Sequence, residues 1–202
     1  IVPLSFVLSL LLSTAGPTPP AVDTAHLEAV EDLSESLANS LLELSVATRR
    51  RDLNAMGRFL GDELSVESFP SIAGALSHEL KWVEHHTWDE QPHAEATAPR
   101  GAFPRGEFLA RLSAFLDHFS EIEDVRFKVK EARFDDNPAA TGEARVYFYV
   151  VGRDAEGRRE WARGTAFITA VGGAKEPWRI TRWRTASLAS DVATTDLFSE
   201  IS

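Results

Sequence analysis

The side chains best suited to acid–base or metal chemistry in this chain are its six histidines. His85 and His86 are adjacent, so on a strand their rings point to opposite faces and do not share one metal ion. His26, His78 and His93 have no carboxylate at a fixed ligand spacing, and the chain contains no His-Glu-x-x-His sequence. The histidines therefore predict no metal site and no cofactor, and surface positions are the favoured interpretation.

Asp117 and His118 are the candidate catalytic residues. His118 lies beside Phe115 and Phe119, which belong to a run of apolar residues with helical spacing. Apolar walls can shift the pKa of a titratable group and so suit it to general-base catalysis. A histidine at the rim of the fold is the competing interpretation, and it predicts a pKa close to the ordinary value of about 6.5.

The large aromatic rings of the C-terminal half form a second candidate site. Such rings can line a ligand pocket, and they can equally form core or an interface between two copies of the chain. The candidate pocket residues are Tyr147, Tyr149, Trp161 and Trp183.

The register of the strands that carry these rings decides which of them share a face. If Gly152 lies opposite Gly157, Tyr149 lies opposite Glu160; a slip of one residue places Tyr149 beside Trp161 instead. Both registers stay open at the level of the sequence.

Apolar and polar residues alternate along four segments, which predicts strands with one buried face. On one of them, Ala144, Val146, Phe148 and Val150 point one way, and Arg145, Tyr147, Tyr149 and Val151 point the other. The turns between the segments are too short for parallel crossovers, so neighbouring strands are antiparallel. The predicted strands are Asp124–Phe134, Glu143–Val151, Arg159–Val171 and Trp178–Leu188.

Three segments have helical periodicity. They are Thr24–Arg50, Asp52–Leu60 and Arg105–Phe119. The apolar stripe of the first segment begins at Leu27. Within residues 61–104, Leu80–Trp88 could be a strand and Ser77–Val83 could equally be a helical turn. The predicted fold class is α+β, with three helices packed on a strongly curved, mainly antiparallel sheet.

Charge excludes some partners. The net charge is −10, and residues 23–99 contain fifteen acids and five bases, a net of −10, whereas residues 100–188 contain thirteen acids and sixteen bases, a net of +3. An acidic chain without a concentrated basic run argues against a nucleic-acid partner. The absence of cysteine excludes disulfides and thiolate chemistry.

Residues 1–21 have the pattern of a secretory signal. An apolar run from Leu4 to Leu12 is followed by the small residues Ser13, Thr14, Ala15 and Gly16. The run is short for a bilayer span, so a permanent membrane anchor is the weaker interpretation. We expect an exported protein whose reading frame begins upstream of Ile1, because the run has no starting methionine and no basic flank.

The order of predicted elements resembles the nuclear transport factor 2-like superfamily, also called SnoaL-like. The segments Arg51–Met56, Phe59–Glu63 and Pro177–Trp183 carry the resemblance, which covers residues 24–188. It implies a cone-shaped domain over residues 22–188, with a first hairpin in the region before the third helix. It also implies that an Asp or His inside the cone can act as a general base.

The last residues, Thr195–Ser202, resemble the phrase that opens the repeat region of exported FG-GAP/VCBS proteins of the ASPIC/UnbV type. This resemblance implies that residues 189–202 are a linker into a downstream β-propeller.

The sequence thus supports two functional hypotheses. The favoured one is a non-catalytic interaction domain of an exported repeat protein. Its partners would be the downstream repeat domain and a second copy bound through the sheet face. The alternative is an isomerase, dehydratase or ligand-binding domain that uses the cone as a pocket.

Overall fold

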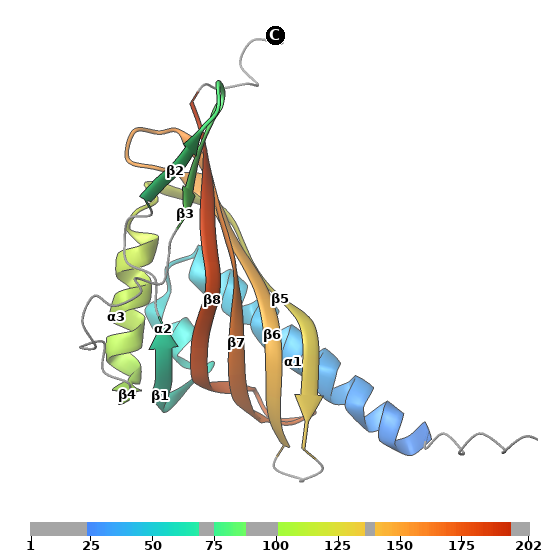
Figure 1. Ribbon diagram of the computed structural model, residues 1–202. Coiled ribbons are helices and arrows are strands. Elements are labelled where there is room, and N and C mark those ends of the chain that lie inside the picture. Colours follow the sequence, from blue (N-terminus) through green and yellow to red (C-terminus); the bar gives the residue numbers. More distant parts are fainter. Residues whose placement is uncertain (1–23, 69–74, 88–100, 136–139, 195–202) are drawn as a thin grey trace, which may run out of the picture.

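The fold is described from a computed structural model, for residues 24–68, 75–87, 101–135 and 140–194. Three helices, α1 (Thr24–Arg49), α2 (Leu53–Gly57) and α3 (Arg105–Leu116), pack against a sheet with the strand order β2-β3-β8-β7-β6-β5. Figure 1 shows the sheet bent around one side of the molecule, with the helices on its inner face. This architecture confirms the predicted α+β class of three helices on a curved, mainly antiparallel sheet.

The four long strands are β5 (Glu121–Phe134), β6 (Ala140–Arg153), β7 (Arg159–Gly172) and β8 (Arg179–Ala193). They pair antiparallel in chain order, as predicted. Bulges interrupt the register in the β5–β6 and β7–β8 pairs, and bulges bend strands, which helps to explain the curvature of the sheet. Strand β8 continues to Ala193, so residues 189–193, which the sequence analysis places in a linker, belong to the sheet.

The region that was ambiguous in the sequence forms short strands: β1 (Leu60–Ser68), β2 (Ala75–Glu79), β3 (Val83–Thr87) and β4 (Gly101–Pro104). Strands β2 and β3 form the expected hairpin, so the helical interpretation of residues 77–83 is wrong. Strand β3 pairs with the end of β8, whereas β1 runs parallel to its beginning. All four short strands thereby belong to the same sheet as the long strands, with β4 joined to it through β1.

The helices differ from the prediction mainly in their ends. Helix α2 stops at Gly57, and Asp52 caps its beginning by accepting a hydrogen bond from the Ala55 N–H (2.9 Å). Helix α3 ends at Leu116, so Asp117 and His118 lie in the turn that follows it and not on the helix.

Helix α1 packs only its C-terminal part against the sheet. Leu37, Leu41 and Leu44 are buried, whereas Leu27, the first residue of the predicted stripe, is 53% exposed. Figure 1 shows the beginning of α1 extending beyond the sheet. None of the helices in the described part of the chain is long and apolar enough to cross a membrane.

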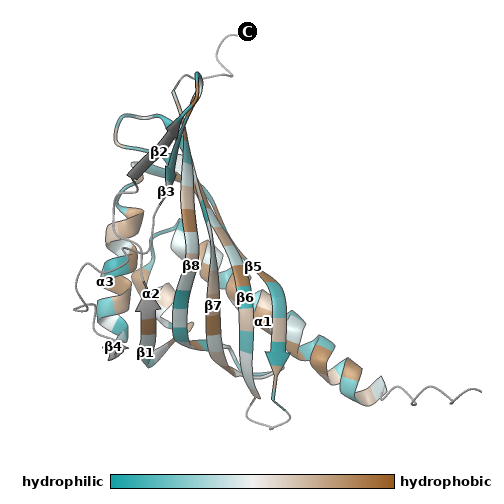
Figure 2. Cartoon of the chain, viewed as in Figure 1, coloured by the Kyte–Doolittle hydropathy of each residue, from teal (hydrophilic) through white to brown (hydrophobic). Residues whose placement is uncertain are grey.

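Buried and more exposed residues alternate along β6 and β7, and Figure 2 shows hydrophobic and hydrophilic residues interspersed along the long strands. On β7 the inward residues are mostly small, which lets large rings from neighbouring strands approach the backbone. At Gly164, a Cβ would lie 2.3 Å from the Ser187 carbonyl and 2.7 Å from the Phe148 ring, so only glycine fits this position. The small residues of β7 therefore make room for the aromatic core.

Candidate functional site

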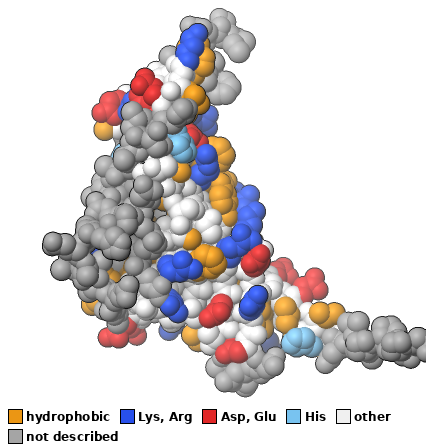
Figure 3. Space-filling model, in the orientation of Figure 1, with side chains coloured by type: hydrophobic (Ala, Val, Ile, Leu, Met, Phe, Trp, Pro, Cys, Tyr) orange, Lys and Arg blue, Asp and Glu red, His pale blue; other side chains and the backbone are white. Residues whose placement is uncertain are grey.

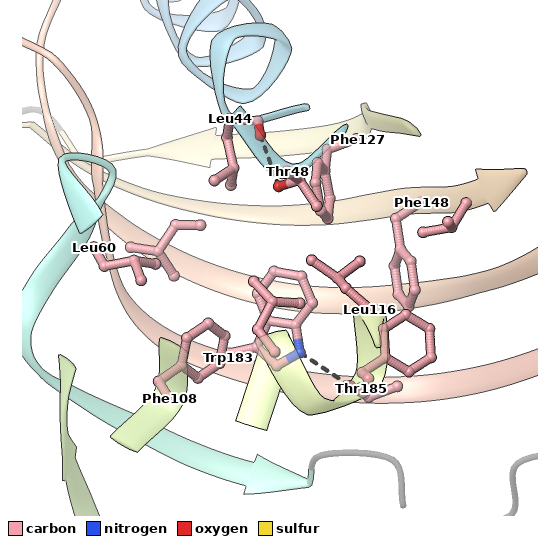
Figure 4. Close-up of a pocket in the computed structure, with 13 residues that line it drawn as sticks. Leu44, Thr48, Leu60, Phe108, Leu116, Phe127, Phe148, Trp183 and Thr185 are labelled. Atoms are coloured by element: carbon pink, nitrogen blue, oxygen red, sulfur yellow. Dashed lines mark hydrogen bonds between the residues drawn. The ribbon is translucent and has the colours of Figure 1, made fainter. Parts of the chain in front are cut away.

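The interior of the cone is nearly filled. A cavity of about 40 Å³ remains between the C-terminal part of α1, helix α3 and the sheet. Figure 4 shows Phe108, Phe127, Phe148 and Trp183 directed into it from helix and strands. The residues of the described chain that line it include no ionisable side chain: Leu44, Thr48, Leu60, Phe108, Leu112, Phe115, Leu116, Phe127, Phe148, Val150, Ile180, Trp183 and Thr185.

The polar groups of this lining are satisfied within the protein. The Trp183 indole N–H donates to Thr185 Oγ1 (2.9 Å), and the Thr48 hydroxyl donates to the Leu44 carbonyl (2.7 Å). Phe108 and Phe148 pack against the Trp183 ring with centroids about 6 Å apart (5.9 and 6.0 Å). The cavity therefore offers an apolar wall and no acid or base.

An acid–base pair forms inside the fold between the candidate His118 and Glu160, a residue that was not among the candidates. His118 Nε2 lies 2.6 Å from Glu160 Oε2, and the Glu160 side chain is only 2% exposed. Asp117 points away from this pair: its carboxylate is 66% exposed and lies 3.5 Å from Arg51. Of the two candidate catalytic residues, His118 is therefore paired with Glu160, and Asp117 contacts Arg51 instead.

This pairing changes the titration of His118. The hydrogen bond to Glu160 raises the pKa of His118 above its ordinary value, partial burial opposes the shift, and the negative charges of Glu160, Asp154 and Glu156 add to it. The expectation of an ordinary pKa at a rim histidine is therefore wrong. The His118 ring also packs edge-on against Phe119, at 5.1 Å between ring centroids.

Polar contacts of Asp154 fix the turn between β6 and β7, close to His118 and Glu160. Asp154 is buried and binds Arg158 twice, through the backbone N–H (2.8 Å) and through Nε (2.8 Å). Ser120 donates its hydroxyl to the Asp154 carbonyl (2.6 Å). The His118–Glu160 pair, held by this network, ties the end of α3 to β7. It therefore has a structural role as well as being a candidate acid–base group.

Glu160 was missed as a site residue, although the sequence carries a signal for it. Every second residue of β7 from Ala162 to Ala170 points inward and is small or apolar. Glu160 is the one acid in that inward series. A charged residue in the buried phase of a strand is expected to have a partner.

The four predicted pocket rings do not line one pocket. Trp183 lies inside the cone, whereas Tyr147, Tyr149 and Trp161 lie on the outer face of the sheet. Tyr149 and Trp161 share an open hollow of about 570 Å³ there. The Tyr149 hydroxyl donates to Asp124 Oδ2 (3.0 Å), and burial together with this hydrogen bond raises the pKa of Tyr149.

Both registers considered for the strands that carry these rings are wrong. Tyr149 pairs with Arg163 and Gly152 with Glu160. The turn is longer than either register assumed, because the Asp154 N–H donates to the Arg158 carbonyl (2.9 Å) and closes it before the strands begin to pair.

No three or more His, Asp or Glu side chains are grouped to hold a metal ion within the described ranges 24–68, 75–87, 101–135 and 140–194. His85 is instead bound to Asp191, at 2.6 Å from Nδ1 to Oδ1. Burial acts to raise the pKa of Asp191, but the hydrogen bonds of His85 and Arg163 outweigh it, and the pKa is lowered.

No family model and no curated protein matches this chain. Among solved structures, a ketosteroid isomerase-like protein from Erwinia carotovora atroseptica is similar, with a TM-score of 0.47, 12% identity, and coverage of 76% of this chain and 95% of that one. A nuclear transport factor 2-like superfamily protein from Salmonella enterica has a TM-score of 0.45 and 14% identity over 79% of this chain and 93% of that one. A conserved protein from Planctomyces limnophilus has a TM-score of 0.46 and 12% identity, covering 81% of this chain and 98% of that one. With TM-scores below 0.5, these similarities carry no argument about the activity of this chain.

Proposed function

We propose that this chain is a non-catalytic interaction domain of an exported protein. The observation that carries the proposal is the filled interior: about 40 Å³ of space remains where a small-molecule site would need roughly 300–1,000 Å³. Rings such as Phe148 and Trp183 occupy the volume that a substrate would need. The domain then acts through its surface.

The alternative is an isomerase, a dehydratase or a ligand-binding domain that uses the cone. The pairing of His118 with Glu160 favours it, since a buried carboxylate and an imidazole are an acid–base pair. Neither residue is among those that line the interior cavity, however. The Nε2 atom of His118 is already hydrogen-bonded to Glu160. The pair therefore serves the fold better than it serves a reaction.

The outer face of the sheet is the proposed interaction surface. The three helices pack on the inner face (Figure 1), and outward rings such as Trp161 (44% exposed) and Phe167 (39% exposed) lie among cations. A downstream repeat domain of the same protein and a second copy are the two partners that the sequence analysis suggests. Charge disfavours the second copy as partner. In a two-fold contact, the basic side chains of this face would lie against the same basic side chains of the other copy and repel them.

Export is part of this proposal. It depends on residues 1–21, which lie outside the described residues, as does the phrase at 195–202 that suggests a following propeller. Secretion of the complete reading frame followed by N-terminal sequencing should give a mature chain that begins between Ala15 and Val22. A mature chain that keeps Leu8–Leu12 would contradict export.

A thermal-shift screen tests the filled interior. We expect no stabilisation of the wild type by fused-ring ketones or phenols, and no turnover of isomerase or dehydratase substrates from these classes. Phe108→Ala is the matched positive control: it removes a cavity-lining ring, and the enlarged apolar space should bind benzene-sized molecules. Saturable stabilisation of the wild type, with turnover that His118→Gln abolishes, would establish the alternative.

A further inference from the structure

The outer face of the sheet has a hollow of about 390 Å³ across the ends of β5 to β8, away from the His118–Glu160 pair. We call it the arginine hollow. Among the residues that the structure describes, its charged side chains come from two adjacent cross-strand rows, and its lining is Glu131, Ala132, Arg133, Glu143, Ala144, Arg145, Phe167, Ile168, Thr169, Arg182 and Arg184. Figure 3 shows Lys and Arg side chains beside apolar ones on one side of the molecule.

We propose that the arginine hollow binds an acidic, extended segment of a protein partner. This inference rests on the proposed interaction role and names the chemistry of the partner.

The charge of the hollow favours an acidic ligand. Its described lining holds four arginines and two glutamates, an excess of two positive charges (4 − 2) on a chain with a net charge of −10. Glu131 pairs with Arg145 at 2.7 Å, and Arg133 lies opposite Glu143 in the register. Arginines concentrated in this way on an acidic protein favour a ligand with carboxylates, which guanidinium groups bind in a bidentate geometry.

The spacing of Arg182 and Arg184 matches that of side chains on an extended peptide. Arg182 and Arg184 are two residues apart on β8, so both side chains point outward, roughly 6–7 Å apart along the strand. An extended peptide repeats its side chains on one face with the same period. Acidic residues at alternate positions of a partner segment can therefore meet Arg182 and Arg184 together.

The hollow suits a peptide better than a nucleic acid. Single-stranded nucleic acids need open aromatic faces for base stacking. Here Arg184 lies over the Phe167 ring at 4.3 Å, and Glu131 and Glu143 interrupt the cationic surface that phosphates would follow. Mixed charges around a partly exposed ring suit a peptide that carries acidic and apolar side chains.

The test uses the whole chain and a fluorescein-labelled peptide with glutamates at alternate positions and one phenylalanine. Fluorescence anisotropy at about 0.15 M salt, where exposed charges are screened beyond about 8 Å, measures its affinity. We expect R182E/R184E to weaken binding at least about tenfold, because charge reversal at a contact replaces attraction with repulsion. R49E/R50E changes the net charge equally at exposed positions next to the end of α1, and it should leave the affinity nearly unchanged.

R182Q/R184Q keeps the test informative if charge reversal prevents folding, and far-UV circular dichroism checks each variant. Equal binding of a peptide with Gln in place of Glu, or equal weakening by R49E/R50E, would overturn the proposal. So would tighter binding of a DNA single strand of the same net charge, or a wild-type dimer that R182E/R184E dissociates in sedimentation. The proposed interaction role would instead be contradicted by turnover or by ligand binding inside the cone. Failure of the peptide proposal can therefore be distinguished from failure of the interaction role.

Discussion

His118 Nε2 and Glu160 Oε2 lie 2.6 Å apart, although the two residues are 42 positions apart in the chain. The contact joins the turn after α3 to the beginning of β7 at a point where Glu160 is almost completely buried. A buried carboxylate requires a partner, so this pair locks the helix onto the sheet. The same two residues are the chain's best acid–base pair, which makes their titration informative about both structure and function.

The pKa of His118 should lie above its ordinary value of about 6.5, and Glu160→Gln should lower it by removing the charged hydrogen-bond partner. NMR titration of the histidine ring protons measures both. Asp117→Asn is the matched control: Asp117 is adjacent in sequence, but its carboxylate contacts Arg51, so the pKa of His118 should hardly change. An equal effect of the two substitutions would contradict the assigned pairing.

Stability should depend on pH through the same group. A histidine whose pKa is raised by folding stabilises the protein fully below its unfolded pKa of about 6.5, and this contribution is lost as pH rises through the higher folded pKa. The difference in unfolding free energy between wild type and His118→Gln should therefore shrink across that interval. Urea denaturation at a series of pH values measures it, and a difference that grows with pH would reverse the sign and refute the account.

The long elements of the fold could be predicted because their periodicity is strong. Alternation along β6 separates Val146 and Phe148 from Tyr147 and Tyr149, and the structure keeps that separation. The sequence marks His118 and Glu160 separately, but their contact could not be predicted, because it depends on the β6–β7 register. That register is set by the hydrogen bonds of Asp154 in the turn, and no count of residues between strands reveals them.

Leu112 and Phe115 of helix α3 differ in burial, so truncating them should affect stability unequally. Phe115 is buried, whereas Leu112 is only partly buried beside the cavity. Phe115→Ala should cost about 3–5 kcal/mol and Leu112→Ala clearly less, because less apolar surface is lost there. Urea denaturation measures both, and Leu27→Ala at the exposed beginning of α1 should cost less than about 0.5 kcal/mol. Equal losses for Leu112 and Phe115 would mean that α3 packs differently.

Gly164 should tolerate no side chain. A Cβ there would lie 2.3 Å from the Ser187 carbonyl and 2.7 Å from the Phe148 ring, so Gly164→Ala should destabilise the protein by about 1–3 kcal/mol, as overpacking does. Gly106→Ala is the matched control, because a Cβ on Gly106 meets no atom within 4 Å and alanine suits a helix. Thermal denaturation should show opposite shifts for the two variants; a neutral Gly164→Ala would contradict the close approach of β7 and Phe148.

If the cone is packed and binds no small molecule, the indole N–H of Trp183 should sense no added ligand. This group donates to Thr185 inside the cavity, and Trp183→Phe identifies its NMR signal among those of the five tryptophans. We predict that fused-ring ketones and phenols, added up to their solubility limits, leave the Trp183 signal unmoved in the wild type. A saturable shift of that signal, accompanied by a change in the His118 titration, would contradict a packed cone and make the cone a working site.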